Sequence, residues 1–120
     1  PEMIAAWRER QPIQQMFSAY SDALVAQDFQ RAYSYHSAEF QQQISYASFV
    51  QYQHDVRARF GTLNNVERRG STIQAWRSPK NVRAVIVADF HYAKGTVRFT
   101  CQLRREGGKW TLLNEKGDEQ

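Results

Sequence analysis

The spacing of apolar residues changes near residue 64, and this change constrains the fold more than any other feature of the chain. Up to Gly61, apolar side chains recur every three or four residues, which is typical of amphipathic helices. From residue 64 onward they alternate with polar side chains, which is typical of strands with one buried face. Helices that are followed by strands, rather than interleaved with them, predict an α+β domain with an antiparallel sheet.

The first main helix is expected at 12–27. Pro12 disfavours helix at Gln11 and suits the first turn of a new helix, so residues 1–11 are interpreted as a short helical or extended N-terminal lead-in. The apolar stripe that follows includes Tyr20 at helical spacing.

Two further helices have recognisable boundaries. Asp28 is a suitable cap for a short second helix, and a polar connection is predicted over 37–43. Ser45 is a good N-cap for a third helix, which Gly61 would end. The N-terminal half therefore contains three predicted helices.

Four strands with short turns are predicted in the remainder of the chain. Gly70 marks a bulge in the first strand, because the alternation slips there. The turns are expected at 78–81, 94–95 and 107–108. The prediction is three helices packed on a curved four-stranded antiparallel sheet, in one domain over 12–115 with a polar tail over 116–120.

The composition fits one globular domain and excludes several classes of protein. The 120 residues are 42% hydrophobic and 13% aromatic, which disfavours disorder. The longest apolar run is well short of the ~20 residues that span a bilayer. One cysteine cannot form an internal disulfide. The net charge of +4 comes from basic residues scattered among acidic and apolar ones, with no nucleic-acid motif, so we do not expect nucleic acid as a partner.

The chain begins at Pro1 rather than Met, which predicts a missing upstream segment. A cleaved signal or anchor would explain this start, and so would deliberate trimming of the chain. The first explanation implies a periplasmic or membrane-anchored protein.

The order of elements resembles the nuclear transport factor 2-like superfamily, also called the cystatin-like α+β cone. The resemblance lies in AYSDALVAQDFQRAYSYHSAEF at 19–40, ISYASFVQYQHDVRARFG at 44–61, and the strands through KWTLLN at 109–114. The chain is most similar to small extracytoplasmic bacterial members. The resemblance implies a cone-shaped pocket between helices and sheet, frequent dimers, and mixed functions that include isomerases, dehydratases, small-molecule binders and protein binders.

A pocket in this fold would be lined by the inward faces of helices and strands and would suit a small apolar ligand. Gln53 stands out, because a glutamine within an apolar stripe needs a hydrogen-bond partner. The alternative is that these side chains fill the core and leave no cavity. The candidate lining residues are Tyr20, Tyr33, Phe49, Gln53, Phe90, Tyr92, Phe99 and Trp110.

Enzymatic members of the superfamily place a carboxylate or a histidine inside the pocket. The inward positions of this chain are predicted to hold almost no carboxylate. His36 is the best candidate for an acid–base residue, with Tyr20 or Tyr33. The alternative is that His36 merely stabilises a helix C-terminus.

The second strand carries apolar residues on its outer face as well. Val85 and Val87 predict a homodimer through that face, where Asp89 and His91 also lie. Two such residues are too few for a metal site, so neither a metal nor a cofactor is expected.

The sequence therefore favours a non-enzymatic binding or protein-interaction domain that holds a small apolar ligand. A pocket enzyme of isomerase or dehydratase type, using His36 with tyrosines, is the alternative. Binding of an anionic polymer by the basic strands is the least favoured hypothesis.

Overall fold

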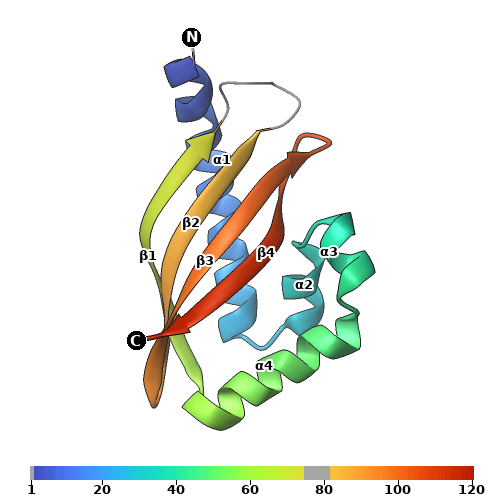
Figure 1. The fold of residues 1–120 in the computed structure, drawn as a ribbon, viewed down its shortest axis with the longest axis vertical. Coiled ribbons are helices and arrows are strands. Elements are labelled where there is room, and N and C mark those ends of the chain that lie inside the picture. The colour runs from blue at the N-terminus through green and yellow to red at the C-terminus, as the bar shows by residue number, and fades with distance from the viewer. Residues whose placement is uncertain (1, 75–81) are drawn as a thin grey trace.

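The computed structural model describes residues 2–74 and 82–120 (Figure 1), and it confirms the α+β prediction. Four helices precede four strands. In chain order the elements are α1 (Glu2–Val25), α2 (Phe29–Ser34), α3 (Ala38–Gln43), α4 (Tyr46–Phe60), β1 (Leu63–Gln74), β2 (Arg83–Tyr92), β3 (Gly95–Glu106) and β4 (Lys109–Glu119).

The strands form one antiparallel sheet in the order β1-β2-β3-β4, so β1 and β4 are the edges. Helix α1 lies along one face of this sheet, α2 and α3 lie beyond the β4 edge, and α4 runs back from there to the start of β1 (Figure 1). A register shift between Arg68 and Gly70 confirms the bulge predicted in the first strand. The turn predicted at 78–81 lies outside the described residues. No described helix has the length and apolar character that crossing a membrane requires.

Helix α1 runs without interruption through Pro12, so the predicted start at residue 12 is wrong. A proline inside a helix costs roughly 3 kcal/mol, because it removes a hydrogen bond and crowds the preceding turn. Tertiary contacts on both sides of Pro12 offset this cost. Ile13 is fully buried, and Glu9 accepts hydrogen bonds from Trp110 Nε1 (2.6 Å) and from Arg105 Nη1. Residues expected to form a separate lead-in are thereby tied to the sheet.

The predicted caps of α2 and α4 are confirmed. Asp28 accepts from the backbone N–H of Arg31, and Ser45 accepts from that of Ser48. Gly61 ends α4 with φ of 85°, a conformation that favours glycine.

The predicted polar connection over 37–43 is instead a short helix, α3. Ser37 is its N-cap and accepts from the backbone N–H of Phe40. Ser37 also donates its own N–H to the carbonyl oxygen of Leu112 in β4. The polar composition concealed this helix, although glutamines at 41–43 are adequate helix formers.

Strand β4 continues to Glu119, so the polar tail predicted at 116–120 is wrong for all but Gln120. Leu103 pairs with Leu112 and Gln102 pairs with Asn114, which leaves Leu113 as an extra residue. Such a bulge exchanges the inward and outward positions of a strand. Before the bulge Trp110 and Leu112 face inward, and after it the odd-numbered residues from 115 to 119 do.

Candidate functional site

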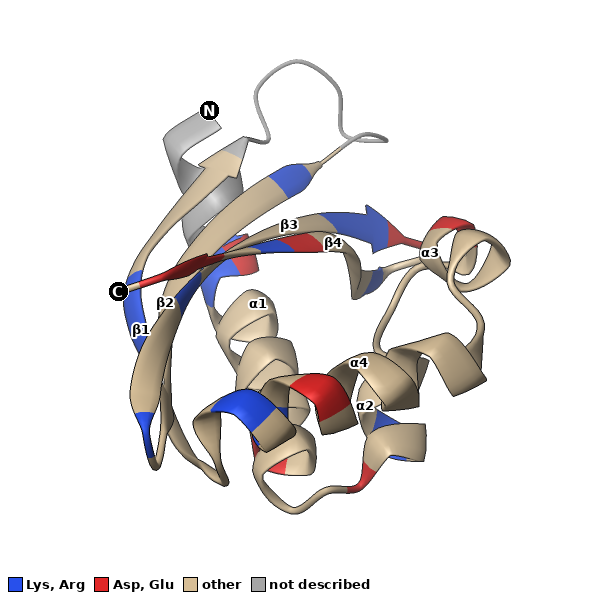
Figure 2. Ribbon diagram, turned by 60° about the horizontal axis from the view of Figure 1, so that its bottom comes forward, with Lys and Arg blue, Asp and Glu red and all other residues tan. Residues whose placement is uncertain are grey.

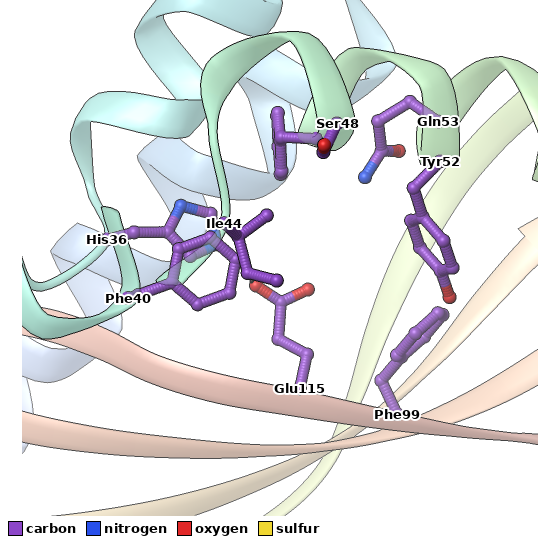
Figure 3. A pocket seen from close by; sticks show the side chains of 9 residues that line it. His36, Phe40, Ile44, Ser48, Tyr52, Gln53, Phe99 and Glu115 are labelled. Carbon is purple, nitrogen blue, oxygen red and sulfur yellow. Dashed lines mark hydrogen bonds and ion pairs between the residues drawn. The ribbon is translucent and has the colours of Figure 1, made fainter. Parts of the chain in front are cut away.

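A half-open pocket of about 280 Å³ lies between α4 and the β3–β4 side of the sheet (Figure 3). Its walls are largely apolar, with a carboxylate and an amide among them. The lining residues are His36, Phe40, Ile44, Ser48, Phe49, Tyr52, Gln53, Phe99 and Glu115.

Glu115 brings a carboxylate into this pocket, so the prediction that the inward positions hold almost none is wrong. The bulge at Leu113 places Glu115 opposite the buried Cys101, on the inner face of the sheet. One carboxylate oxygen lies 2.8 Å from His36 Nε2, and both oxygens lie 2.7 Å from the Tyr20 hydroxyl. The Glu115 side chain is 13% exposed and that of His36 is 0% exposed. Two buried donors therefore hold the carboxylate in place.

The two ring nitrogens of His36 both face acceptors. Nδ1 lies 3.1 Å from the carbonyl oxygen of Tyr33, and Nε2 faces Glu115. A ring N–H at either position therefore has an acceptor within hydrogen-bond distance. Phe40 stacks on the imidazole with ring centroids 4.1 Å apart, and Phe49 contacts it edge-on.

Tyr20 is a permanent donor to Glu115. Burial raises the pKa of the Tyr20 phenol well above its usual range, and the nearby Glu115 carboxylate raises it further. The phenol is therefore protonated at neutral pH and donates to the carboxylate.

Gln53 is 6% exposed and lines the pocket opposite Glu115 (Figure 3). Its side-chain amide makes no hydrogen bond to any residue that the structure describes. The amide is exposed to the half-open pocket rather than enclosed by protein atoms. The amide is therefore available to a molecule that enters the pocket.

Three of the eight predicted lining residues line this pocket, namely Phe49, Gln53 and Phe99. Tyr20 lies behind Glu115, and Tyr33 donates its hydroxyl to the carbonyl of Ile44 at 2.6 Å.

The other three predicted lining residues belong to the core. Phe90 packs on Phe99, Tyr92 packs on Phe60, and Trp110 donates to Glu9 of α1. These side chains face inward as predicted, but neighbouring side chains fill the space around them.

Sequence reasoning missed Phe40, Ile44, Ser48, Tyr52 and Glu115. Strict alternation across β4 would have placed Glu115 on the outer face. The adjacent Leu112 and Leu113 were the available signal, because two consecutive apolar residues break the alternation and indicate a bulge.

The outer face of the sheet carries Asp89 and His91, as predicted, beside the half-buried Val85 and Val87. Arg98 holds Asp89 through Nε (2.7 Å) and Nη2 (3.1 Å), and these bonds lower the pKa of the carboxyl.

Glu67 lies beside Asp89 and His91 and is a third side chain of a type that binds metal ions. One possible metal-binding atom from each of the three residues lies within 4.8 Å of the others. His91 contacts Glu67 through Nε2 and Thr96 through Nδ1. Since Arg98 already occupies both oxygens of Asp89, this group forms a polar network. Figure 2 shows Lys and Arg residues spread over several strands and helices, with Asp and Glu between them.

Comparison with solved structures identifies the fold. A protein of unknown function with a cystatin-like fold from Nostoc punctiforme matches with a TM-score of 0.68 at 11% identity, over 92% of this chain and 90% of that one. A nuclear transport factor 2-like protein of unknown function from Pseudomonas putida matches with a TM-score of 0.59 at 13% identity, over 97% and 87%. The chain therefore has the nuclear transport factor 2-like, or cystatin-like, fold.

Two further matches have the same fold. A candidate scytalone dehydratase from Novosphingobium aromaticivorans matches with a TM-score of 0.60 at 13% identity, over 95% of this chain and 85% of that one. Bd1075 of Bdellovibrio bacteriovorus matches with a TM-score of 0.66 at 12% identity, and this chain spans 41% of its length. No family model matches the sequence, and no curated protein does. At sequence identities this low, the structural similarity shows a shared fold and does not show a shared function.

Proposed function

We propose that this domain binds a small, uncharged and mostly apolar molecule that carries a hydrogen-bond donor. One observation carries the proposal: a nearly buried amide without a described partner, Gln53, faces a held carboxylate, Glu115, across an apolar pocket. Pockets that bind small molecules combine apolar walls with a few polar groups of this kind.

The pocket's size and charge limit the ligand. A volume of about 280 Å³ is near the lower end for ligand sites, so one ring with short substituents would fill it. The aromatic side chains of Phe40, Phe49 and Phe99 offer flat walls. His36 and Tyr20 already contact the Glu115 carboxylate, so we expect the pocket to take a neutral donor, such as a hydroxyl, rather than an ammonium group.

The hydroxyl requirement can be tested with two compounds that differ only at that group. Isothermal titration calorimetry of 4-ethylphenol should show binding, and 4-ethylanisole should bind at least about tenfold more weakly. The anisole lacks the donor, and a hydrogen bond to a charged group contributes roughly 1.5–3 kcal/mol. Equal binding of the two compounds, or binding of neither, would contradict the proposal.

A pair of variants locates the contact. Glu115→Gln should weaken binding of 4-ethylphenol about tenfold, because the neutral amide is a weaker acceptor than a carboxylate. Asp118→Asn removes a carboxylate from the outward side of the same strand and should leave the affinity unchanged. An unchanged affinity in Glu115→Gln would place the ligand elsewhere.

A second candidate function is acid–base catalysis of isomerase or dehydratase type, favoured by the support that His36 and Tyr20 give to Glu115. Glu115 would accept the substrate proton. His36 would be a positioning residue, because its side chain is fully buried and both ring nitrogens are engaged. The likeness to a candidate scytalone dehydratase supports only a compatible fold.

Proton exchange separates the two candidates. The probe 4-hydroxycyclohexanone carries both a donor and C–H groups next to a carbonyl. An enzyme would accelerate its C–H exchange in D₂O, as followed by NMR, and Glu115→Gln would abolish the acceleration. A binding domain would leave the exchange rate at its background value.

A further inference from the structure

A second hollow, of about 270 Å³, adjoins the first along α4. Two residues, Tyr52 and Phe99, line both hollows, so the two share a wall. We call them the first and second compartments. The second is lined by Tyr52, Asp55, Val56, Arg59, Phe60, Val97, Phe99, Gly117 and Glu119.

The two compartments follow the same pair of elements. On α4 the lining runs from Ser48 to Phe60, which spans about 18 Å at 1.5 Å per residue. On β4 it runs from Glu115 to Glu119, which spans about 13 Å at 3.3 Å per residue. The two stretches line one groove between helix and strand, which Tyr52 and Phe99 divide.

The partition between the compartments has one fixed part and one movable part. Phe99 is fixed: it is 3% exposed, packs on Phe90, and rests against Gly117, where a Cβ would lie 2.8 Å from the ring. Tyr52 points down from α4 toward Phe99 (Figure 3) and is 49% exposed. Its hydroxyl makes no hydrogen bond within the described part of the chain. A change of Tyr52 rotamer would therefore join the compartments at little cost.

The chemistry of the groove changes along its length. The first compartment holds the Glu115 carboxylate and the Gln53 amide. The second has apolar walls from Val56, Phe60 and Val97 beside the exposed Asp55. At its far end Arg59 and Glu119 form an exposed ion pair of 2.6 Å. The polar groups for a ligand head and the apolar walls for a tail are thus separated by Tyr52.

We infer that the ligand is an amphiphile whose polar head binds Glu115 and Gln53 and whose apolar tail passes Tyr52 into the second compartment. Tyr52 is then the residue that determines how long a tail is accepted. This inference rests on the proposed function, since it assumes that the head occupies the first compartment.

A homologous series of 4-alkylphenols, from 4-methyl to 4-hexyl, tests the inference by calorimetry. Wild-type affinity should rise with tail length, by up to about fourfold for each methylene that leaves water. Tyr52→Ala should strengthen binding of the longer tails, since no rotation is then needed. A wild-type affinity that is flat beyond 4-ethylphenol would overturn the inference.

A variant that blocks the second compartment tests whether the rise in affinity with tail length depends on that compartment. Val56→Trp fills that compartment, so it should remove the dependence on tail length and leave 4-methylphenol unaffected. Ala58→Trp places the same residue on the exposed face of α4 and should behave as wild type. An undiminished dependence in Val56→Trp would overturn the inference, provided that thermal unfolding shows a folded variant. Failure of 4-methylphenol itself to bind wild type would instead refute the proposed function.

Discussion

Two largely buried carboxylates occupy opposite faces of the same sheet, and their partners differ. Asp89, on the outer face, has both oxygens bonded to the guanidinium of Arg98, a partner that is 39% exposed. Glu115, on the inner face, is held by the fully buried His36 and Tyr20.

The hydrogen bonds of Asp89 are satisfied within the fold, whereas Glu115 remains accessible to a ligand. A bidentate arginine matches the geometry of a carboxylate and satisfies it. His36 and Tyr20 approach Glu115 while the carboxylate still lines a pocket. Only the inner carboxylate is therefore placed to meet a ligand, although both are well hydrogen-bonded.

Removal of the histidine should have the largest effect on stability. His36→Leu leaves the largely buried Glu115 without its hydrogen-bond partner, and breaking a buried pair in this way typically costs 3–5 kcal/mol. We expect roughly 3 kcal/mol, the lower end of that range, because Glu115 faces an open pocket. Urea denaturation at pH 7 measures the free energy of unfolding.

The double variant His36→Leu, Glu115→Leu is the matched control. It removes the unpaired carboxylate together with its partner, so it should be more stable than His36→Leu alone. If the double variant were less stable than the single one, the energetic coupling between the two side chains would be disproved.

Tyr20→Phe should have an intermediate effect. The ring stays in place while the hydroxyl that bonds both oxygens of Glu115 is lost, which should lower the free energy of unfolding by about 1–2 kcal/mol. Tyr35→Phe removes a hydroxyl whose bond to Arg31 is exposed, and it should change the stability by less than about 0.5 kcal/mol. If the free energy of unfolding fell equally in the two variants, the hydrogen bonds to Glu115 would contribute no more to stability than an exposed one.

Local signals predicted most of the fold. Asp28, Ser45 and Gly61 mark helix ends through contacts within a few residues, and all three act as predicted. The continuation of α1 through Pro12 was not predictable in this way. It depends on Glu9 meeting Trp110 and Arg105, which are about a hundred residues away in sequence.

The site was less predictable, because its central residue depends on strand register. One extra residue at Leu113 turns Glu115 from the solvent side to the pocket side. His36 was recognised from the sequence, but its partner was not, since their contact joins positions 79 residues apart. The same alternation correctly placed Asp89 and His91 outside, because β2 and β3 pair without a register shift.

Asp89→Asn should have the smallest effect, and the effect should vanish in acid. The hydrogen bond from Arg98 lowers the pKa of Asp89 in the folded state, so its contribution to stability is complete above the unfolded value of about 3.9. That contribution is lost as the pH falls through the folded pKa. The difference in unfolding free energy between wild type and Asp89→Asn should therefore be present at pH 7 and shrink toward zero near pH 2, as measured by urea denaturation.

Affinity for 4-ethylphenol should not change at pH 7, because Asp89 faces away from the pocket. A loss of binding in this variant would show that the two faces of the sheet are coupled, and would remove the contrast between a saturated outer carboxylate and an available inner one.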